Sequence, residues 1–359
     1  MKKIVKTEQS GAMDLSEEEL EYYSRQIVMA EMGYNTQLKL KNSKVCLLGV
    51  GGLGSPAAMQ LAAMGVGYLR IVDRDIVELT NLHRQHIYGI NDKGFPKVEA
   101  AAKRLQQLNP FIKIEPLPLS VNEFTVNNLI KDMDVVVDGL DSMKARYAVN
   151  RACIKHRVPY VFGAAITTIG NLSTIVPRET ACLECFYGNL EDKKLPKCGV
   201  VGVHPSLVNI ISSLEVSEAI RIITGKQPLL TNKLLHFDLD EMEFNEIQLS
   251  KVDSCPVCGE NQSSSRMLIT HELVEEICGR KGKKVFVITP RENMDINLVD
   301  LKKFLGEKRI KIQVTGKLGL TFSIKDAKVS ILKSGITILE GIQKKDKAIK
   351  FFNELTGNC

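Results

Sequence analysis

The sequence lacks the patterns of fibrous and repetitive proteins. It has no Gly-X-Y repeat, no sustained heptad pattern and no long tandem repeat, which excludes collagen, a long coiled coil and a solenoid. It also lacks the composition of a disordered chain, since 44% of its residues are hydrophobic and 25% are charged. A chain of 359 residues can form two or three domains, each with its own core.

The N-terminus lacks the apolar segment of a signal peptide, although it begins with basic residues. We therefore expect a cytoplasmic protein. In that compartment, the nine cysteines are expected to bind a metal or to act in catalysis rather than to form disulfides.

One segment is long and apolar enough to be considered as a membrane span. Residues 45–69 contain no charged residue, and a stretch of 25 residues can cross a bilayer. However, the segment holds six glycines together with Pro56 and Gln60, and only its second half is helix-like. We predict a buried strand, a tight turn and a helix, without membrane contact.

Charge is distributed unevenly along the chain. Residues 265–359 hold 19 Lys or Arg and 11 Asp or Glu, a net charge of +8, whereas residues 1–264 carry a net charge of −2. The composition changes at residues 259–267, a polar stretch with three consecutive serines that is typical of a linker. We predict one domain at 1–262 and a small basic domain at 267–359.

The first part alternates strand and helix patterns, which predicts an α/β fold with a mostly parallel, Rossmann-like sheet covered by helices. We expect strands at 44–50, 68–73, 112–119, 134–140, 160–167, 171–177, 234–240 and 244–249. We expect helices at 54–65, 97–108, 124–131, 143–156 and 205–224, and a leading helix at 17–32 that starts with a capping box from Ser16 to Glu19.

The second part is predicted to be a small α+β unit. We expect helices at 269–280, 295–305 and 344–356, and strands at 284–290, 310–315, 319–323, 327–332 and 336–340.

A glycine-rich loop follows the first predicted strand and opens a helix. Gly49, Gly51, Gly52 and Gly54 form the pattern G-x-G-G-x-G, which allows a tight turn and brings backbone N–H groups to a phosphate. Asp73 ends the next strand, where an acidic residue binds ribose hydroxyls. The pattern predicts a nucleotide site and leaves open a dinucleotide with hydride transfer or a triphosphate. Cations at Arg84 and Lys97 favour a triphosphate, although both are also typical of solvated surface.

The sequence resembles the ThiF/MoeB/HesA family, prokaryotic relatives of ubiquitin-activating enzymes, over residues 15–258. The resemblance rests on motifs that occur in order: YYSRQI (22–27), LLGVGGLGS (47–55), IVDRDIVELTNLHRQ (71–85), FPKVEAA (95–101), DGLDSMKARYAVN (138–150), VFGAA (161–165), CLEC (182–185) and CPVC (255–258).

The resemblance implies a role for each matching residue. The loop glycines would bind ATP, Asp73 would bind its ribose, and Arg84 and Lys97 would bind its phosphates. Asp141 would bind Mg²⁺ or orient the reacting phosphate. It is followed by Ser142, where the family usually has Asn. Asn81 and Gln85 would make supporting polar contacts. Arg25 would contribute to the active site of the other subunit of a homodimer.

Four cysteines form two matched pairs. Cys182 and Cys185 make one C-x₂-C pair and Cys255 and Cys258 the other, with 69 residues between the pairs. Four thiolates suit a structural Zn²⁺, and the family carries such a site. The alternatives are that one or both pairs have no function or have a redox role.

Cys198 is a candidate nucleophile. It lies near Lys193, Lys194 and Lys197 and ahead of the helix that starts near Pro205, an environment that favours a thiolate. In the family, an active cysteine in this loop accepts the activated acyl group or forms a persulfide. Here Gly199 follows at once, where the family usually has about three more residues before this segment. A bystander thiol is therefore an equal alternative.

The family implies adenylation of the C-terminal glycine of a small ubiquitin-like sulfur carrier ending in Gly-Gly, with ATP, Mg²⁺ and Zn²⁺ as cofactors. Thiamine, molybdopterin or tRNA thiolation could follow, or protein conjugation. The first alternative is an enzyme that cyclises threonylcarbamoyl-adenosine in tRNA, since the basic part would suit RNA. The second is an NAD-dependent oxidoreductase. For the basic part we favour carrier binding over RNA binding or a plain solvated surface.

Overall fold

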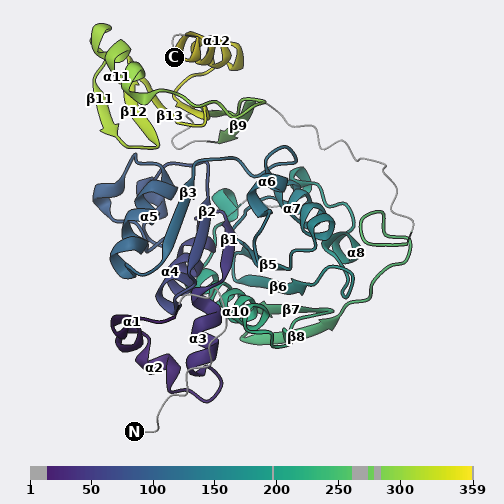
Figure 1. Ribbon diagram of the computed structural model, residues 1–359. Helices are drawn as coiled ribbons and strands as arrows, with labels where there is room; N and C mark the ends of the chain where they lie inside the picture. The colour runs from purple at the N-terminus through teal and green to yellow at the C-terminus, as the bar shows by residue number, and fades with distance from the viewer. Residues whose placement is uncertain (1–13, 196–197, 261–273, 279–283, 358–359) are drawn as a thin grey trace.

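The computed structural model describes residues 14–195, 198–260, 274–278 and 284–357 (Figure 1). Its strands form one eight-stranded sheet, in the order β3-β2-β1-β4-β5-β6-β7-β8, and one six-stranded sheet, in the order β11-β12-β13-β14-β10-β9. Among the described residues, no helix is both long and apolar enough to cross a membrane.

The larger sheet is parallel in its first five strands and antiparallel beyond them. The parallel order 3-2-1-4-5 is that of a Rossmann fold, which confirms the predicted class. The strands are β1 (Lys44–Leu48), β2 (Tyr68–Val72), β3 (Lys113–Leu117), β4 (Val135–Asp138), β5 (Tyr160–Ile166), β6 (Ile169–Ile175), β7 (Lys233–Asp238) and β8 (Glu243–Gln248).

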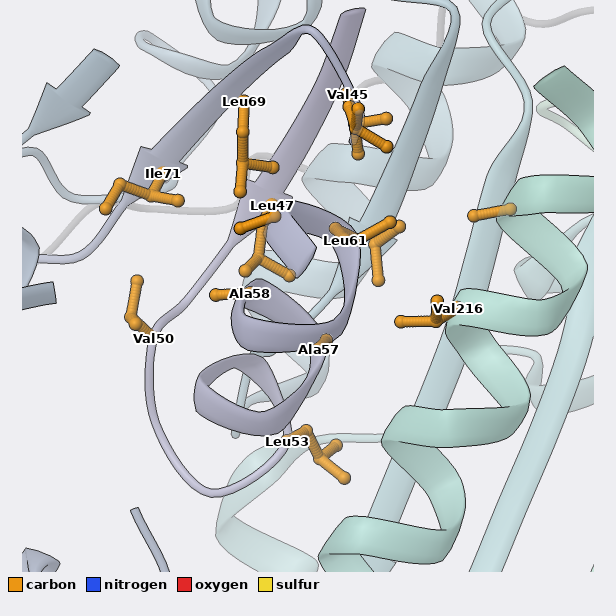
Figure 2. Packing of buried hydrophobic residues seen from close by; sticks show 14 of the residues in the cluster. Val45, Leu47, Val50, Leu53, Ala57, Ala58, Leu61, Leu69, Ile71 and Val216 are labelled. Atoms are coloured by element: carbon orange, nitrogen blue, oxygen red, sulfur yellow. The ribbon is translucent and has the colours of Figure 1, made fainter. Parts of the chain in front are cut away.

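Helices cover both faces of this sheet, so its central strands are buried on both sides. Along β1, Val45 and Leu47 pack toward one face and Cys46 and Leu48 toward the other. Figure 2 shows the first of these cores, where β1 and β2 pack against α4 (Gly54–Met64) and against Val216 of α10 (Pro205–Thr224). The same core includes α5 (Lys97–Leu108), whereas α6 (Val126–Ile130) and α7 (Met143–His156) belong to the opposite core. The uncharged segment 45–69 is thus a strand, a turn and a helix, as predicted.

The N-terminal prediction is only partly correct. The capping box of Ser16 and Glu19 is present, but the expected helix 17–32 is divided into α1 (Glu17–Tyr22) and α2 (Ser24–Ile27). A further helix that we did not predict, α3 (Gly33–Lys41), follows at Gly33, whose φ of +66° is favoured by glycine. The break at Tyr23 lets its ring turn into the core, where it is 3% exposed.

The smaller sheet contains β9 (Val274–Cys278), β10 (Lys284–Ile288), β11 (Ile312–Thr315), β12 (Gly319–Ile324), β13 (Ala327–Leu332) and β14 (Thr337–Glu340). Its helices are α11 (Leu298–Glu307) and α12 (Lys345–Thr356). The predicted α+β class is therefore confirmed. The helix expected at 269–280 is wrong for residues 274–278, because this segment pairs antiparallel with β10. The predicted linker at 259–267 lies mostly outside the described residues, and the domain limits stay a prediction.

Candidate nucleotide and metal sites

The glycine loop makes a turn that leaves no room for side chains. Gly49 has a φ of +91°, and a Cβ atom built on it would lie 2.3 Å from the carbonyl oxygen of Gly139. A Cβ on Gly54 would lie 1.9 Å from the carbonyl oxygen of Gly49. Glycine is thus required at both positions, and the first turn of α4 packs directly on the end of β1.

Asp73 holds the loop from the end of the next strand. Its carboxylate accepts hydrogen bonds from the backbone N–H of Val50 and of Asp75, both at 2.8 Å. The hydroxyl of Tyr88 donates to the carbonyl of Val50, also at 2.8 Å. Burial raises the pKa of Asp73, although the nearby Lys97 opposes the shift. Because a carboxylate offers about four lone-pair positions, Asp73 can still accept ribose hydroxyls.

Lys97 is a buried cation at the start of α5. Its Nζ lies 3.0 Å from Oδ2 of Asp75, and the side chain is 7% exposed. Burial acts to lower the pKa of Lys97, but the negative charges of Asp75, Asp73 and Asp141 outweigh it and raise this pKa. Burial acts to raise the pKa of Asp75, but the charges of Lys97 and Arg74 outweigh it, so the net shift is downward. Lys97 is therefore a fixed positive charge beside the Asp73–Asp75 segment, which holds the glycine loop through Asp73.

Arg84 and Gln85 lie along the glycine loop, as their predicted roles require. A Cβ atom built on Gly52 would lie 3.7 Å from Nε of Arg84, and one on Gly51 would lie 3.9 Å from Nε2 of Gln85. Gln85 is 2% exposed, and within the described part of the chain its Oε1 has no hydrogen-bond partner. A buried amide oxygen without a partner is costly, which is consistent with a ligand group that completes the site.

Asn81 and Asp141 occupy different positions relative to this loop. Asn81 is buried in the short helix η1 (Leu79–Asn81), where its Oδ1 accepts from the backbone N–H of Glu78 at 2.8 Å. It therefore shapes the segment that carries Arg84. Asp141 follows β4 and is exposed. Its negative charge acts to raise the pKa of both Lys97 and Arg74, so Asp141 is within electrostatic range of these two cations.

Arg25 is not part of this cluster. It is exposed on α2, and its neighbour Gln26 donates through Nε2 to the carbonyl of Met64 at 2.8 Å. Met64 is the last residue of α4, whereas the glycine loop precedes the first. The eleven residues of α4 correspond to about 16 Å at 1.5 Å per residue, so α2 lies at the far end of that helix from the loop.

Sequence reasoning missed a buried ion pair at the end of β4, beside Gly139, on which the glycine loop packs. Asp138 ends β4 with no exposed area, and its Oδ2 lies 3.0 Å from Nε of Arg146. It also accepts hydrogen bonds from the hydroxyl of Tyr160 and from the backbone N–H of Leu140. An acidic residue at the end of an apolar strand, with an Arg one helix turn into α7, was the available signal. Glu215 of α10 was missed as well, because the surrounding sequence is largely apolar and predicts only a helix packed in the core.

The four predicted metal ligands come together at one point. All four Sγ atoms lie within 4.8 Å of one another. The Sγ–Sγ distances that join neighbouring cysteines are 3.7 Å (Cys182–Cys255), 3.9 Å (Cys182–Cys185) and 3.3 Å (Cys185–Cys258). A tetrahedral Zn²⁺ with Zn–S bonds of about 2.3 Å places its sulfurs about 3.8 Å apart, so the arrangement fits this ion.

Each cysteine pair lies in a tight turn that is closed by a backbone hydrogen bond, here called a knuckle. The N–H of Cys185 donates to the carbonyl of Cys182 at 2.9 Å, and the N–H of Gly259 donates to the carbonyl of Cys255 at 2.9 Å. A Cβ on Gly259 would lie 2.2 Å from the carbonyl oxygen of Asp253, so the second knuckle requires glycine. Cys182, Cys255 and Cys258 are buried in the core beside α7, where they have no access to a substrate.

Cys198 is the first residue of the short helix α9 (Cys198–Val201). Its side chain and the preceding residues 196–197 lie outside the described part of the structure. Its use as a nucleophile therefore stays a prediction.

Comparison with known proteins agrees with these features. The family model described as "ThiF family" matches residues 23–257. The SAMP-activating enzyme E1 of Haloferax volcanii is 36% identical over 249 residues, covering 69% of this chain and 92% of that protein. The sulfur carrier protein adenylyltransferase of Thermus thermophilus is 34% identical over 266 residues, covering 72% of this chain and 98% of that protein. The crystal structure of E. coli MccB with ATP is similar with a TM-score of 0.56 and 27% identity, covering 62% and 69%.

Proposed function

Because the chain belongs to the ThiF family of adenylyltransferases, we propose that it adenylates the C-terminal glycine of a small ubiquitin-like sulfur-carrier protein. The observation that carries this proposal is the position of two cations: Arg84 lies against the glycine loop, and Lys97 pairs with Asp75 in the Asp73–Asp75 segment that holds this loop. Two cations suit the charge of a triphosphate, and an NAD-dependent oxidoreductase would leave them without a role. The names of the relatives also support an adenylating enzyme rather than an oxidoreductase.

In the proposed reaction, the carrier's carboxylate attacks the α-phosphorus of ATP. The bond from that phosphorus to the oxygen bridging to the β-phosphate breaks, and pyrophosphate leaves with the bonding electron pair. The carboxylate is ionised at neutral pH, so no general base is needed. The protein lowers the barrier by positioning the two reactants and by stabilising charge on the transferring group.

Each residue of the site has a proposed part in this step. Backbone N–H groups of the loop and the side chains of Arg84 and Lys97 hold the phosphates, and Asp73 holds the ribose. Gln85 contributes the polar atom that is left without a partner. Asp141 is the proposed Mg²⁺ ligand, because an exposed carboxylate oxygen suits this hard cation, which supplies charge neutralisation when bound.

Two further proposals complete the assembly. We propose a structural Zn²⁺ at the four cysteines, since their sulfurs fit a closed tetrahedral site. We also propose a homodimer in which Arg25 completes the site of the partner subunit. Two findings support it: Arg25 is far along α4 from its own loop, and the apolar side chains of Val28 and Met29 beside it are 77% and 50% exposed.

The test is to incubate the protein with ATP, Mg²⁺ and a Gly-Gly-ending β-grasp carrier from the same genome. Intact-mass spectrometry would detect an AMP adduct on the carrier, and pyrophosphate release would be followed in parallel. Matching adduct and pyrophosphate would establish the reaction, and repeating the assay with Cys198→Ser would test for a thioester or persulfide step. If no adduct forms with several carriers, the proposal is wrong, and the RNA-modifying alternative is to be tested next.

A further inference from the structure

The smaller sheet is covered on both faces. Phe286, Leu320 and Val329 come from three of its strands, and they pack on one face in a core cluster with residues of α11 and α12. On the other face, Val287, Leu332 and Ile336 form a separate apolar cluster with Ile76 of the larger unit. Figure 1 shows the same layering, with the small sheet lying between its own helices and the larger unit.

The position of Ile76 in the larger unit links this contact to the nucleotide site. It follows the segment Asp73–Asp75, which contains the proposed ribose ligand and the ion-pair partner of Lys97. The small sheet therefore rests on the chain segment that shapes the nucleotide site.

One charged contact reaches this segment directly. Glu275 of β9 binds Arg74 through a two-pronged hydrogen bond, with Nη1 to Oε1 and Nη2 to Oε2 both at 2.7 Å. Arg74 stands between Asp73 and Asp75 in the chain, and its side chain is 27% exposed. Such paired, charge-assisted hydrogen bonds fix the plane of the guanidinium group.

Polar contacts from the small sheet also reach the neighbouring loops. Glu99, two residues after Lys97, accepts hydrogen bonds from the backbone N–H groups of Lys317 and Leu318, both at 2.8 Å. Ser334 donates to the carbonyl of Pro118, just beyond β3, at 2.5 Å. The start of α5 and the loop after β3 are thus held by turns of the small sheet, and the loop after β2 is held by Glu275 of its strand β9.

We propose that the small sheet is a positioning element of the nucleotide site, and that Glu275 acts as a positioning residue through Arg74. Without the carboxylate of Glu275, the guanidinium of Arg74 would turn to its remaining acidic neighbours, which include Asp75 and Asp141. Arg74 would then compete with Lys97 for Asp75, and Lys97 would lose the partner that fixes its Nζ. This inference rests on the proposed function, because it assumes that Lys97 binds the phosphates of ATP.

The experiment uses Glu275→Gln, which keeps the shape of the side chain and removes its charge. The matched control is Glu276→Gln, the next residue of the same strand, whose carboxylate pairs with Lys284 within the small sheet at 2.6 Å. Pyrophosphate release at varied ATP would give KM and kcat for each full-length variant, and calorimetry would give the ATP dissociation constant. We expect E275Q to raise the ATP dissociation constant about tenfold and to lower kcat/KM by at least as much, because Lys97 both binds the phosphates and stabilises the transferring charge, whereas E276Q should behave like the wild type.

A double-mutant cycle identifies the route of the effect. In an Arg74→Gln background, E275Q should add no further loss, because the two residues act as a unit. Glu275→Asp, which keeps the charge, should recover part of the ATP affinity and is the second variant if E275Q folds poorly. An unchanged ATP affinity in E275Q, an equal loss in E276Q, or additive losses in the cycle would overturn the inference alone. Failure of the wild type to bind ATP would instead refute the proposed function, and with it this inference.

Discussion

Arg146 and Asp138 form an ion pair in the interior of the larger sheet, with Nε and Oδ2 3.0 Å apart and side chains 8% and 0% exposed. Arg146 also donates to the carbonyls of Leu140 at 2.6 Å and Gly163 at 2.8 Å. The pair thus ties the end of β4 to the middle of β5, next to Gly139, against which the glycine loop packs.

Removing one partner of this pair should destabilise the fold strongly. Arg146→Met would leave the carboxylate of Asp138 buried without its counter-charge, and we expect a loss of about 3–5 kcal/mol in the free energy of unfolding. Urea titration followed by circular dichroism would measure it. Lys233→Met, which breaks the exposed pair with Glu246, should cost less than about 1 kcal/mol and is the control. A loss of similar size in both variants would contradict this account.

Lys97 should be essential for pyrophosphate release. Lys97→Met removes the buried positive charge beside the Asp73–Asp75 segment, and we expect the rate to fall by about 10²–10³. Lys93→Met, which changes an exposed lysine four residues earlier, should leave the rate unchanged. Retention of more than a tenth of the activity in the Lys97 variant would rule out its proposed role.

The four cysteines should hold zinc independently of Cys198. We expect Cys185→Ser to lose bound zinc and to melt at a lower temperature, because three thiolates and a hydroxyl bind the ion more weakly. Cys198→Ser should keep one zinc per chain and an unchanged melting temperature. Metal analysis of the purified variants and thermal melting would check both expectations, and zinc loss in the Cys198 variant would show that the ligand set is wrong.

Glu215 should make stability fall as the pH rises. It is fully buried, and within the described residues neither of its carboxylate oxygens has a hydrogen-bond partner. Burial, with the nearby charge of Asp138, raises the pKa of Glu215 well above its ordinary value. The folded state therefore keeps a proton that the unfolded state releases above its own, ordinary pKa, so raising the pH favours unfolding.

Glu215→Gln removes this titration. Stability of the wild type should fall, relative to the variant, by up to about 1.4 kcal/mol per pH unit between the unfolded and folded pKa of Glu215. Urea titrations of both proteins between pH 6 and pH 8 would show the difference. Parallel pH profiles would mean that Glu215 does not hold its proton in the folded state.

Local patterns predicted most of the larger unit. The limits of α7 and α10 agree with the predictions to the residue, since each helix has a side-chain cap and an apolar face. The cluster of four cysteines was predictable because two matched C-x₂-C pairs are typical of a shared metal site. The glycine loop and Asp73 were predictable because their spacing reflects one strand–turn–helix–strand unit.

The features that the sequence did not predict depend on contacts between distant parts of the chain. The segment Val274–Cys278 has enough helix-forming residues to suggest a helix, but its pairing with β10 makes it a strand. The contact of Glu275 with Arg74 joins residues 201 positions apart, and no local pattern indicates such a pair. The role of Arg25 stays a prediction, because it involves a second chain.

The distance in sequence between the two cysteine knuckles has a consequence for how the protein is assembled. Between them the chain forms α10, β7 and β8, which must be in place before the second knuckle can meet the first. Closing a loop of this length costs conformational entropy, so the nascent chain would hold the ion weakly until those elements have docked. Capture of the proposed Zn²⁺ would then be a late step of folding. Without zinc, the sheet would form while the segment that carries Cys255 and Cys258 stayed undocked.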